Sequence, residues 1–460
     1  MNPLCNQLEY CILQVPLTLP HEQELRHHHH SKQDQFCAAQ NYSEKEIIQK
    51  LEGNSFSMCS FVDRTIKLDK MSGTIQGFSK ELTLTVKCFF GFEETLIEEL
   101  NELGYPKVSK LNRAVQLKGT WKDVYFLNLH LRCAISILVE ITTFRIKSED
   151  DLYNQARKIN WSNFFDVKKT FAVRGAIFSD LFTSTHYPNL LLKDAVVDHF
   201  REAAGTRPDV ELKRPQVMLD LYVNNFEATI SVNTSGNPLF QRGYRSTAGD
   251  APINEVVAAS LIRLSGWDRK TTFIDPFCGS GTFLIEAALL ASGIPSNIER
   301  QHYAFKNFKN FDAELWDETY DSATRIVRSL PCEILGSDIS DEMVLKSRRN
   351  LRTFSFGRFI KISPKPFNEV KTPEGKVFIL SNPPYDVRMD AEVETLYQEI
   401  GSWLKHEIKD GKACIISSSI EGLKSIGLKP SSKVKVYNGN LDCSFRSYDL
   451  FEGKRKENIT

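Results

Sequence analysis

From about residue 253 onward, helical segments alternate with short runs of uninterrupted apolar residues. These runs are TTFIDPF, CEILGSDIS, KVFILSNPPY and KACIISSS. Apolar strands without a polar face are typical of parallel sheets that helices cover on both faces. The sequence therefore predicts a doubly wound α/β domain. Because ligands bind such sheets at the carboxyl ends of the strands, the residues after each run are the candidates for a site.

The residues ahead of this domain predict a smaller α+β region made of two groups of elements. ELTLTVKCFF and RAVQLKG alternate like half-buried strands, and each is followed by a helical pattern. The second group closes with two alternating runs around an Asn224–Asn225 turn, which suits a hairpin. We expect Thr120 and Ser148 to be the N-caps of two of the helices.

The composition excludes several classes of protein. Its apolar share of 41% and charged share of 25% are those of a soluble globular chain. None of the ten cysteines forms a Cys-x-x-Cys pair, so we expect reduced thiols, no disulfide framework and no metal site. No apolar stretch approaches the roughly 20 residues that cross a bilayer. We expect a cytoplasmic protein without membrane contact, whose residues 1–78 are a poorly ordered extension rather than a signal peptide.

The first strand run ends at Asp275 and passes into a turn that contains two glycines. Gly279 and Gly281 allow a tight turn and a close approach of the backbone to a ligand, and Ser280 or Thr282 can cap the following helix. The turn lacks a third glycine at the spacing typical of dinucleotide sites, which argues against NAD. An acidic residue here suits a ligand that has a cationic amino-acid end and no phosphate. S-adenosylmethionine is such a ligand.

The second strand run ends at Asp338, and the helical pattern DEMVLKSRRNLRTF follows it. A carboxylate at this place can accept hydrogen bonds from both hydroxyls of a ribose. The alternative role for Asp338 is to cap the helix, but Ser340 suits that role better. We therefore assign Asp338 to the cofactor.

The third strand run ends in LSNPPYD, where an asparagine precedes two prolines and a tyrosine. Because proline lacks a backbone donor, the carbonyl groups here must find donors elsewhere. An exocyclic amine of a nucleobase offers two hydrogens, which the Asn382 side chain and the Pro383 carbonyl can accept while Tyr385 stacks on the ring. Holding this weakly nucleophilic nitrogen in line with a methyl group supplies a large part of the catalysis. We call Asn382, Pro383, Pro384 and Tyr385 the amine clamp.

The motifs DPFCGSGTFLIEAA, GSDIS and SNPPY, in this order, resemble those of class I methyltransferases that act on exocyclic amines with S-adenosylmethionine. GNPLFQRGYRSTAGDAPINEVVAASLIRLSGW and KVYNGNLDCSFRSYDL are similar to bacterial large-subunit (23S-type) ribosomal RNA guanine-N2 methyltransferases with a THUMP domain. The chain corresponds to the N-terminal half of those relatives that carry a second methyltransferase module. The resemblance implies an RNA substrate and indicates no obligate protein partner. The domains it implies are a ferredoxin-like lead-in (79–126), a THUMP domain (127–238) and a Rossmann-like methyltransferase domain (239–460).

The resemblance also implies roles for single residues. Related enzymes carry an acidic residue at the adenine amino group, but SPKPFNEV offers Pro366 and Phe367 instead, and Phe367 can stack on adenine. The implied cofactor residues are Asp275, Phe277, Gly279, Gly281, Thr282, Asp338, Ile339 and Phe367.

Two basic segments are implied as RNA contacts. The loop GTRPDVELKRP would meet phosphate groups, although its residue types alone favour a solvated loop. The arginine-rich connector after GNPLFQ would approach the cofactor or the target base, and a solvated linker is the alternative. The residues concerned are Arg207, Lys213, Arg214, Arg242, Tyr244 and Arg245.

Four other functions are alternatives to ribosomal RNA methylation. Transfer RNA guanine-N2 methylation remains open, because THUMP domains serve such enzymes as well. An adenine-N6 DNA methyltransferase also fits the clamp, but the sequence shows no domain that reads a DNA sequence. A pyrimidine C5 methyltransferase needs a cysteine nucleophile near the clamp, and no cysteine lies between Cys332 and Cys414. A non-catalytic RNA-binding assembly factor has no reason to keep the whole set of site residues.

Overall fold

The structure is a computed structural model, and it describes residues 81–245, 253–325, 329–385, 390–439 and 441–452. The extension predicted for residues 1–78 lies outside the described residues. All the described residues belong to one compact unit, Ile75–Thr460. Within this described part, no helix is long and apolar enough to cross a membrane.

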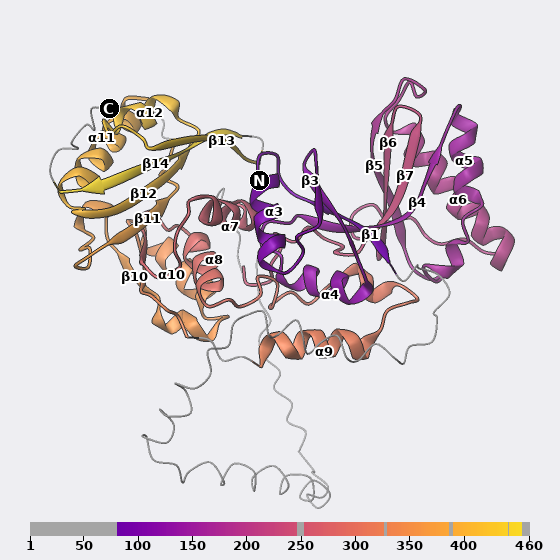
Figure 1. Ribbon diagram of the computed structural model, residues 1–460, viewed down its shortest axis with the longest axis horizontal. Coiled ribbons are helices and arrows are strands. Elements are labelled where there is room, and N and C mark those ends of the chain that lie inside the picture. The colour runs from indigo at the N-terminus through magenta and orange to yellow at the C-terminus, as the bar shows by residue number, and fades with distance from the viewer. Residues whose placement is uncertain (1–80, 246–252, 326–328, 386–389, 440, 453–460) are drawn as a thin grey trace, which may run out of the picture. The chain divides into compact units, whose positions relative to one another are not determined.

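The N-terminal part of the described chain is built on one sheet of seven strands, in the order β2-β3-β1-β4-β7-β6-β5 (Figure 1). The two groups of elements expected from the sequence meet in β4, whose first residues pair with β1 and whose later residues pair with β7. The elements are β1 (Leu82–Lys87), α3 (Glu93–Glu102), β2 (Val108–Leu111), β3 (Ala114–Gly119), α4 (Trp121–His130), β4 (Ser136–Arg145), α5 (Glu149–Arg157), η3 (Trp161–Asn163), β5 (Phe171–Phe178), α6 (Tyr187–Ala204), β6 (Val217–Asn224) and β7 (Glu227–Asn233).

Local sequence signals set the ends of several elements as expected. Thr120 caps α4 through a capping box, in which its hydroxyl accepts from the backbone N–H of Asp123 while the Asp123 carboxylate accepts from the backbone N–H of Thr120. Ser148 accepts from the backbone N–H of Asp151 at the start of α5. Asn225 has a φ of 52° in the turn between β6 and β7. The predicted caps and hairpin are confirmed.

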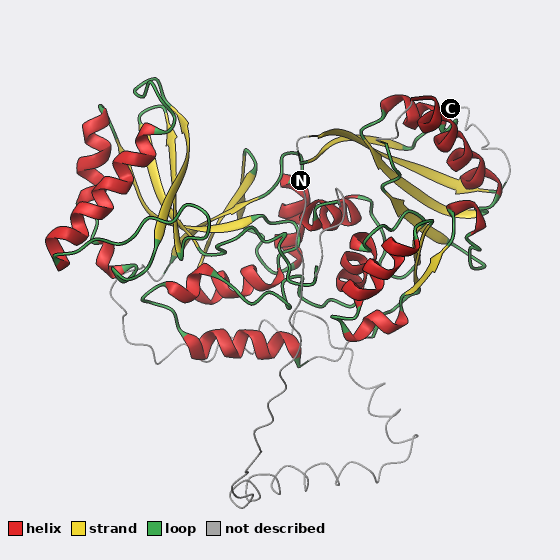
Figure 2. Cartoon of the chain, turned by 180° about the vertical axis from the view of Figure 1, so that it is seen from behind, coloured by secondary structure: helices red, strands yellow, loops and turns green. Residues whose placement is uncertain are grey.

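The second sheet has seven strands in the order β10-β9-β8-β11-β12-β14-β13, with helices on both faces (Figure 2). Pairing is parallel from β10 to β12, and β14 runs antiparallel to both β12 and β13. The elements are α7 (Glu255–Leu264), β8 (Thr272–Asp275), α8 (Thr282–Ala291), η4 (Ala304–Asn307), α9 (Ala313–Thr324), β9 (Ile334–Asp338), α10 (Asp341–Leu351), η5 (Ser355–Phe359), β10 (Lys361–Pro364), η6 (Phe367–Glu369), β11 (Val377–Ser381), α11 (Asp390–His406), β12 (Asp410–Ser417), α12 (Ile420–Ser425), β13 (Ser432–Asn438) and β14 (Leu441–Phe451).

This arrangement confirms the predicted doubly wound fold, since the four apolar runs are β8, β9, β11 and β12. Buried apolar side chains of these strands pack on α7 and α8 on one face and on α11 and α12 on the other. The edge strand β10 and the antiparallel hairpin of β13 and β14 were not predicted from the sequence.

The strand order reverses between β8 and β11, because the chain moves outward from β8 to β9 and β10 before it returns to β11. Ligands of open α/β sheets bind at such a reversal. Asp275 ends β8 and Ser381 ends β11, and the Ser381 hydroxyl donates to Oδ1 of Asp275 at 2.6 Å. The strand ends singled out in the sequence therefore meet at this point.

Candidate active site

A pocket of about 580 Å³ opens at the carboxyl ends of β8, β9 and β11. Its volume is typical of sites for small molecules and cofactors, which span about 300–1,000 Å³. It brings together residues from all three motifs, whereas Gly281, Pro383 and Tyr385 are not among its lining residues. The predicted residues that line it are Asp275, Phe277, Gly279, Thr282, Asp338, Ile339, Phe367, Asn382 and Pro384.

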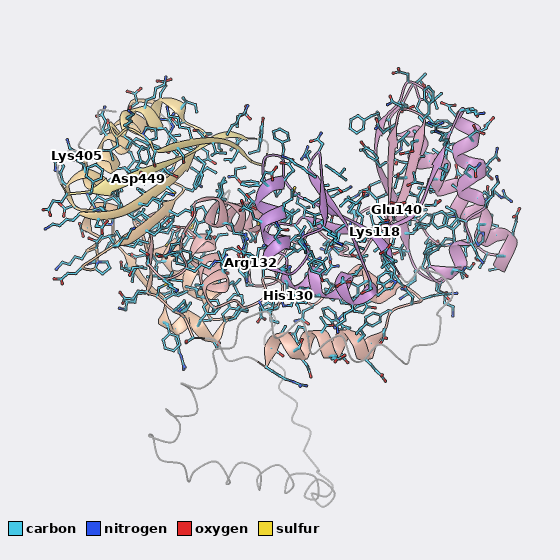
Figure 3. All side chains as sticks on the ribbon, viewed as in Figure 1. Lys118, His130, Arg132, Glu140, Lys405 and Asp449 are labelled. Carbon is cyan, nitrogen blue, oxygen red and sulfur yellow. The ribbon has the colours of Figure 1, made fainter. Side chains whose placement is uncertain are left out.

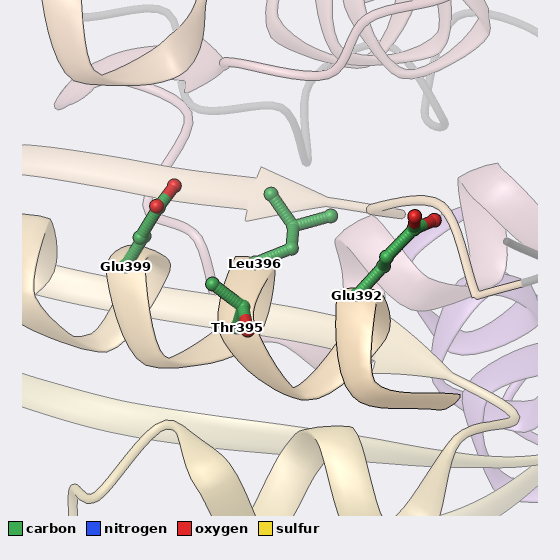
Figure 4. A pocket seen from close by; sticks show the side chains of 4 residues that line it. All are labelled: Glu392, Thr395, Leu396 and Glu399. Atoms are coloured by element: carbon green, nitrogen blue, oxygen red, sulfur yellow. The ribbon is translucent and has the colours of Figure 1, made fainter. Parts of the chain in front are cut away.

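A second hollow, of about 370 Å³, adjoins this pocket along α11 (Figure 4). Glu392, Thr395, Leu396 and Glu399 line it, and Leu396 and Glu399 also line the larger pocket. Two glutamates on one helix face repel an anionic ligand such as a phosphate backbone. The larger pocket, which contains the three motifs, is therefore the candidate active site.

Asp275 lies on the floor of the pocket with only 1% of its surface exposed. Its Oδ1 accepts hydrogen bonds from the Ser381 hydroxyl at 2.6 Å and from the backbone N–H of Phe277 at 3.2 Å. Burial, with a smaller contribution from the nearby carboxylate of Asp338, nevertheless raises the pKa of Asp275 to about 7 against the effect of these two donors. A buried carboxylate with so high a pKa is stabilised by a cation, as expected for the positive end of the ligand.

Asp338 is held by the backbone on both of its carboxylate oxygens. Its Oδ2 accepts from the N–H of Gly279 at 2.9 Å, and its Oδ1 accepts from the N–H of Ser340 at 2.9 Å. Ser340 caps α10, because its hydroxyl accepts from the N–H of Met343. An ionised carboxylate accepts about four hydrogen bonds, so Asp338 is fixed in orientation and can still accept from two hydroxyls.

The two glycines of the first turn have different roles. Both have positive φ, 51° at Gly279 and 84° at Gly281, which confirms the predicted tight turn. A Cβ at Gly279 would meet nothing within 4 Å, and this residue lines the pocket. A Cβ at Gly281 would collide with the Ser347 hydroxyl on α10, so this glycine serves packing between helices rather than contact with a ligand.

The predicted cap of α8 is wrong. The N-cap is Gly281 itself, which has no side chain, and neither Ser280 nor Thr282 caps the helix. The hydroxyl oxygen of Thr282 instead accepts from Nη2 of Arg245 at 3.1 Å. Because Thr282 lines the pocket, this bond places the Arg245 side chain next to a lining residue, and its guanidinium also pairs with Glu255 at 3.1 Å. Contact of Arg245 with the cofactor or the target base remains a prediction.

One end of the pocket is aromatic and apolar. Phe277 and Phe367 stack with ring centroids 5.1 Å apart, and the Trp403 ring packs on Phe367 at an interplanar angle of 83°. Ile339 lines the same pocket with 79% of its surface exposed. An exposed isoleucine and stacked rings in one pocket are suited to enclosing a flat, apolar group.

Asn368 is a lining residue that the sequence interpretation missed. It follows β10, whose last residue, Pro364, pairs with Asp338 at the end of β9. Related enzymes carry a carboxylate in this segment, but an amide also suits the position because it both donates and accepts hydrogen bonds. The sequence feature that could have identified Asn368 is its position as a polar residue, charged or uncharged, directly after Phe367.

The amine clamp follows directly from the end of β11. Asn382 and Pro384 line the pocket, Pro383 is buried and Tyr385 is partly exposed. The Oδ1 atom of Asn382 is buried, and it has no hydrogen-bond partner among the described residues. Such atoms are rare in folded proteins, because an unpaired buried acceptor costs roughly 1–3 kcal/mol. The pocket therefore presents an acceptor that needs a donor.

Comparison with known proteins identifies the domains. Three family models match the chain: the RlmL ferredoxin-like domain at residues 83–138, the THUMP domain at 147–233 and the RMKL-like methyltransferase domain at 242–447. The chain therefore contains a ferredoxin-like, a THUMP and a methyltransferase-type domain, as these models describe them. It is 35% identical over 376 residues to the "Ribosomal RNA large subunit methyltransferase K/L" of Shewanella frigidimarina, a match that covers 80% of this chain and 53% of the relative. The chain spans about half the length of the curated relatives it matches.

Solved structures share the architecture of this chain. The crystal structure of SMU.472 complexed with SAH has a TM-score of 0.72 and 26% identity, over 82% of this chain and 100% of that one. A possible methylase from Clostridium difficile 630 has a TM-score of 0.72 and 27% identity over the same shares. The second sheet is therefore a class I methyltransferase fold.

The expectation that Arg242 and Tyr244 approach the cofactor or the target base is wrong. Arg242 is 1% exposed, and its guanidinium donates to the backbone carbonyl oxygens of Arg132 and two leucines and pairs with Glu286. Tyr244 is 2% exposed, and its hydroxyl donates to the same glutamate at 3.0 Å. Both side chains are enclosed by protein, so they hold the connector in place and cannot touch a ligand in this conformation.

The loop between α6 and β6 carries the other predicted RNA contacts. Arg207, Lys213 and Arg214 are all exposed, and no ion pair of their side chains is seen within the described residues. Exposed cations of this kind are available to phosphate groups. Contact of these three residues with RNA remains a prediction.

Proposed function

We propose that this protein transfers a methyl group from S-adenosylmethionine to the exocyclic N2 of a guanine in large-subunit ribosomal RNA. The observation that carries the proposal is the buried, unpartnered Oδ1 of Asn382, which lies in one pocket with the carboxylates of Asp275 and Asp338. The names of the relatives support ribosomal RNA as the substrate, and the SAH in SMU.472 supports the cofactor.

The residues of the pocket fit S-adenosylmethionine, which when bound supplies a methyl group on a positively charged sulfur. Asp275 is suited to the cationic amino-acid end, since a cation relieves the penalty that burial places on its ionised form. Asp338 is oriented to accept from the ribose hydroxyls. Ile339 and Phe367 enclose the adenine, and the amide of Asn368 replaces the acidic residue of related enzymes at its edge.

The amine clamp orients the nitrogen of the substrate. One N–H of the exocyclic amine donates to Oδ1 of Asn382 and the other to the carbonyl oxygen of Pro383, while Tyr385 stacks on the base. With both hydrogens held, the lone pair of the nitrogen points toward the cofactor side of the pocket. Positioning of this kind contributes as much as about 7–11 kcal/mol to a barrier, so the clamp needs no strong base.

The N-terminal sheet delivers the RNA in this proposal. Arg207, Lys213 and Arg214 bind phosphates and position the substrate without reading its sequence. The domain limits proposed from the sequence are 79–126, 127–238 and 239–460. All six cysteines of the described residues are free, which fits a reducing compartment, and we place the protein in the cytoplasm.

The proposal is tested with the recombinant protein, isotope-labelled S-adenosylmethionine and separate pools of large-subunit ribosomal RNA and transfer RNA. Nucleoside mass spectrometry should find labelled N2-methylguanosine in the ribosomal pool. The same nucleoside in transfer RNA alone would change the substrate, and labelled N6-methyladenosine would change the target base. No label in either pool, together with no binding of S-adenosylmethionine in calorimetry, would contradict the enzymatic proposal and favour an RNA-binding assembly factor.

A further inference from the structure

The hairpin of β13 and β14 ends at the same sheet edge as the amine clamp. Ser417, at the carboxyl end of β12, pairs with Ser444 near the start of the antiparallel β14. Asn438 pairs with Leu441 at the tip of the hairpin. The residues predicted to bind the cofactor follow β8, β9 and β10 on one side of β11, so the hairpin tip lies on the opposite, substrate side. Three strand spacings separate β11 from β13, which is about 14 Å.

Apolar side chains are exposed at this hairpin tip. Phe90, from the segment after β1, is 52% exposed, and its ring meets the Tyr437 ring edge-on with centroids 5.9 Å apart. Tyr437 pairs with Asp442 in the register of the hairpin, one position from the tip. Large apolar side chains grouped on a surface indicate a binding region.

Two cations accompany these side chains. The Lys435 ammonium lies 5.3 Å from the centroid of the Tyr437 ring, and it pairs with the exposed Asp442 at 3.2 Å. An exposed pair of this kind is worth little, so Lys435 can exchange its partner for a phosphate. The exposed Arg113 lies in the turn between β2 and β3, and its carbonyl oxygen accepts from the N–H of Cys88, two residues before Phe90.

We propose that Phe90, Tyr437, Lys435 and Arg113, here named the hairpin patch, bind unpaired nucleotides beside the methylated base. The inference rests on the proposed function, and it identifies the surface that receives the flanking RNA. A base that enters the clamp leaves its stack, so its neighbours lose a stacking partner. Aromatic side chains next to cations restore stacking and contact the adjacent phosphates, whatever the sequence. The acidic hollow on α11, in contrast, repels that backbone.

The test compares the variants Phe90→Ala and Tyr437→Ala with the matched control Phe359→Ala. Phe359 is 58% exposed with the Arg358 guanidinium 4.7 Å from its ring, and it precedes β10 at the opposite edge of the sheet. Phe90→Leu keeps an apolar contact with Tyr437 and controls for loss of packing. Binding of a short labelled single-stranded RNA is measured by fluorescence anisotropy at fixed salt, and KM and kcat are measured with large-subunit ribosomal RNA.

Each alanine variant of the patch should weaken RNA binding and raise the KM for RNA about ten-fold, equivalent to about 1.4 kcal/mol. The kcat and the affinity for S-adenosylmethionine should stay unchanged, as should all values of Phe359→Ala. If the wild type methylates RNA and the variants keep its KM, the patch proposal is wrong while the proposed function stands. If the wild type binds RNA but methylates none, and the alanine variants bind RNA more weakly, the patch proposal stands and the proposed function fails. Loss of self-association without a change in RNA binding would overturn the patch proposal and mark a protein interface.

Discussion

Asp275→Asn is the substitution that most directly tests the electrostatics of the pocket. Burial raises the pKa of Asp275 from 3.8 to about 7, so ionising this carboxyl without a cation beside it costs about 4 kcal/mol. Because the folded-state pKa lies above the unfolded value, the contribution of Asp275 to stability falls as the pH rises from about 4 to about 7. Above pH 7 the penalty is complete. An asparagine keeps the acceptor for Ser381 and removes the charge.

The variant should therefore match the wild type in free energy of unfolding near pH 4 and exceed it by up to about 4 kcal/mol at pH 8. Urea unfolding across this range, without cofactor, measures the difference. Calorimetry should show the opposite effect on function: the wild type loses affinity for S-adenosylmethionine below about pH 7, and Asp275→Asn binds weakly at every pH. A stability difference between variant and wild type that does not change with pH would refute the raised pKa of Asp275. An unchanged affinity of the variant for S-adenosylmethionine would refute the contact between this carboxylate and the cofactor.

Three further substitutions separate catalysis, packing and fold. Asn382→Ala should lower kcat about a hundred-fold by loosening the amine, with unchanged affinity for S-adenosylmethionine in calorimetry; a wild-type kcat would contradict the clamp. Gly281→Ala should destabilise the protein by about 1–3 kcal/mol in urea unfolding, because the residue has a positive φ and the new Cβ meets the Ser347 hydroxyl; unchanged stability would rule out the close contact. Arg242→Ala should cost about 3–5 kcal/mol of stability by leaving the Glu286 carboxylate buried without its partner; a stable variant with weakened RNA binding would restore Arg242 as an RNA contact.

The sequence predicted the pocket correctly where a local pattern decides the geometry. Uninterrupted apolar runs identified parallel strands, and parallel strands bring their carboxyl ends to one edge, so Asp275, Asp338 and Asn382 had to converge. The caps at Thr120 and Ser340 depend only on a hydroxyl and an N–H three residues later. Such signals lie within one element and its immediate neighbour in the chain.

The remaining features depend on contacts between distant segments. Arg242 looked like a surface cation, and only its contacts with the segment after α4 and with Glu286 in α8 show that it is enclosed. Position 281 requires a glycine because the Ser347 hydroxyl, on another helix, occupies the place of a Cβ. Asn368 was missed because the expectation was tied to a carboxylate, and Phe90 meets Tyr437 from a position more than three hundred residues away in the chain. No periodicity in the sequence reports such pairs.

Helix α8 links the pocket to the N-terminal part of the protein. Thr282, in its first turn, lines the pocket. Arg132, which is labelled in Figure 3, lies in the N-terminal part of the described chain. Its Nη2 atom donates to the carbonyl oxygens of Leu289 in α8, at 3.1 Å, and of Ile294 just beyond it, at 2.5 Å. Arg132 is itself held, because its carbonyl oxygen accepts from Arg242 at 2.6 Å. Arg132 and Arg242, which hold the connector in place, therefore also fix the C-terminal end of α8, and the N-terminal end of α8 lines the pocket. Their burial makes this linkage stiff, so we expect Arg242→Ala to lower the affinity for S-adenosylmethionine although Arg242 touches no ligand.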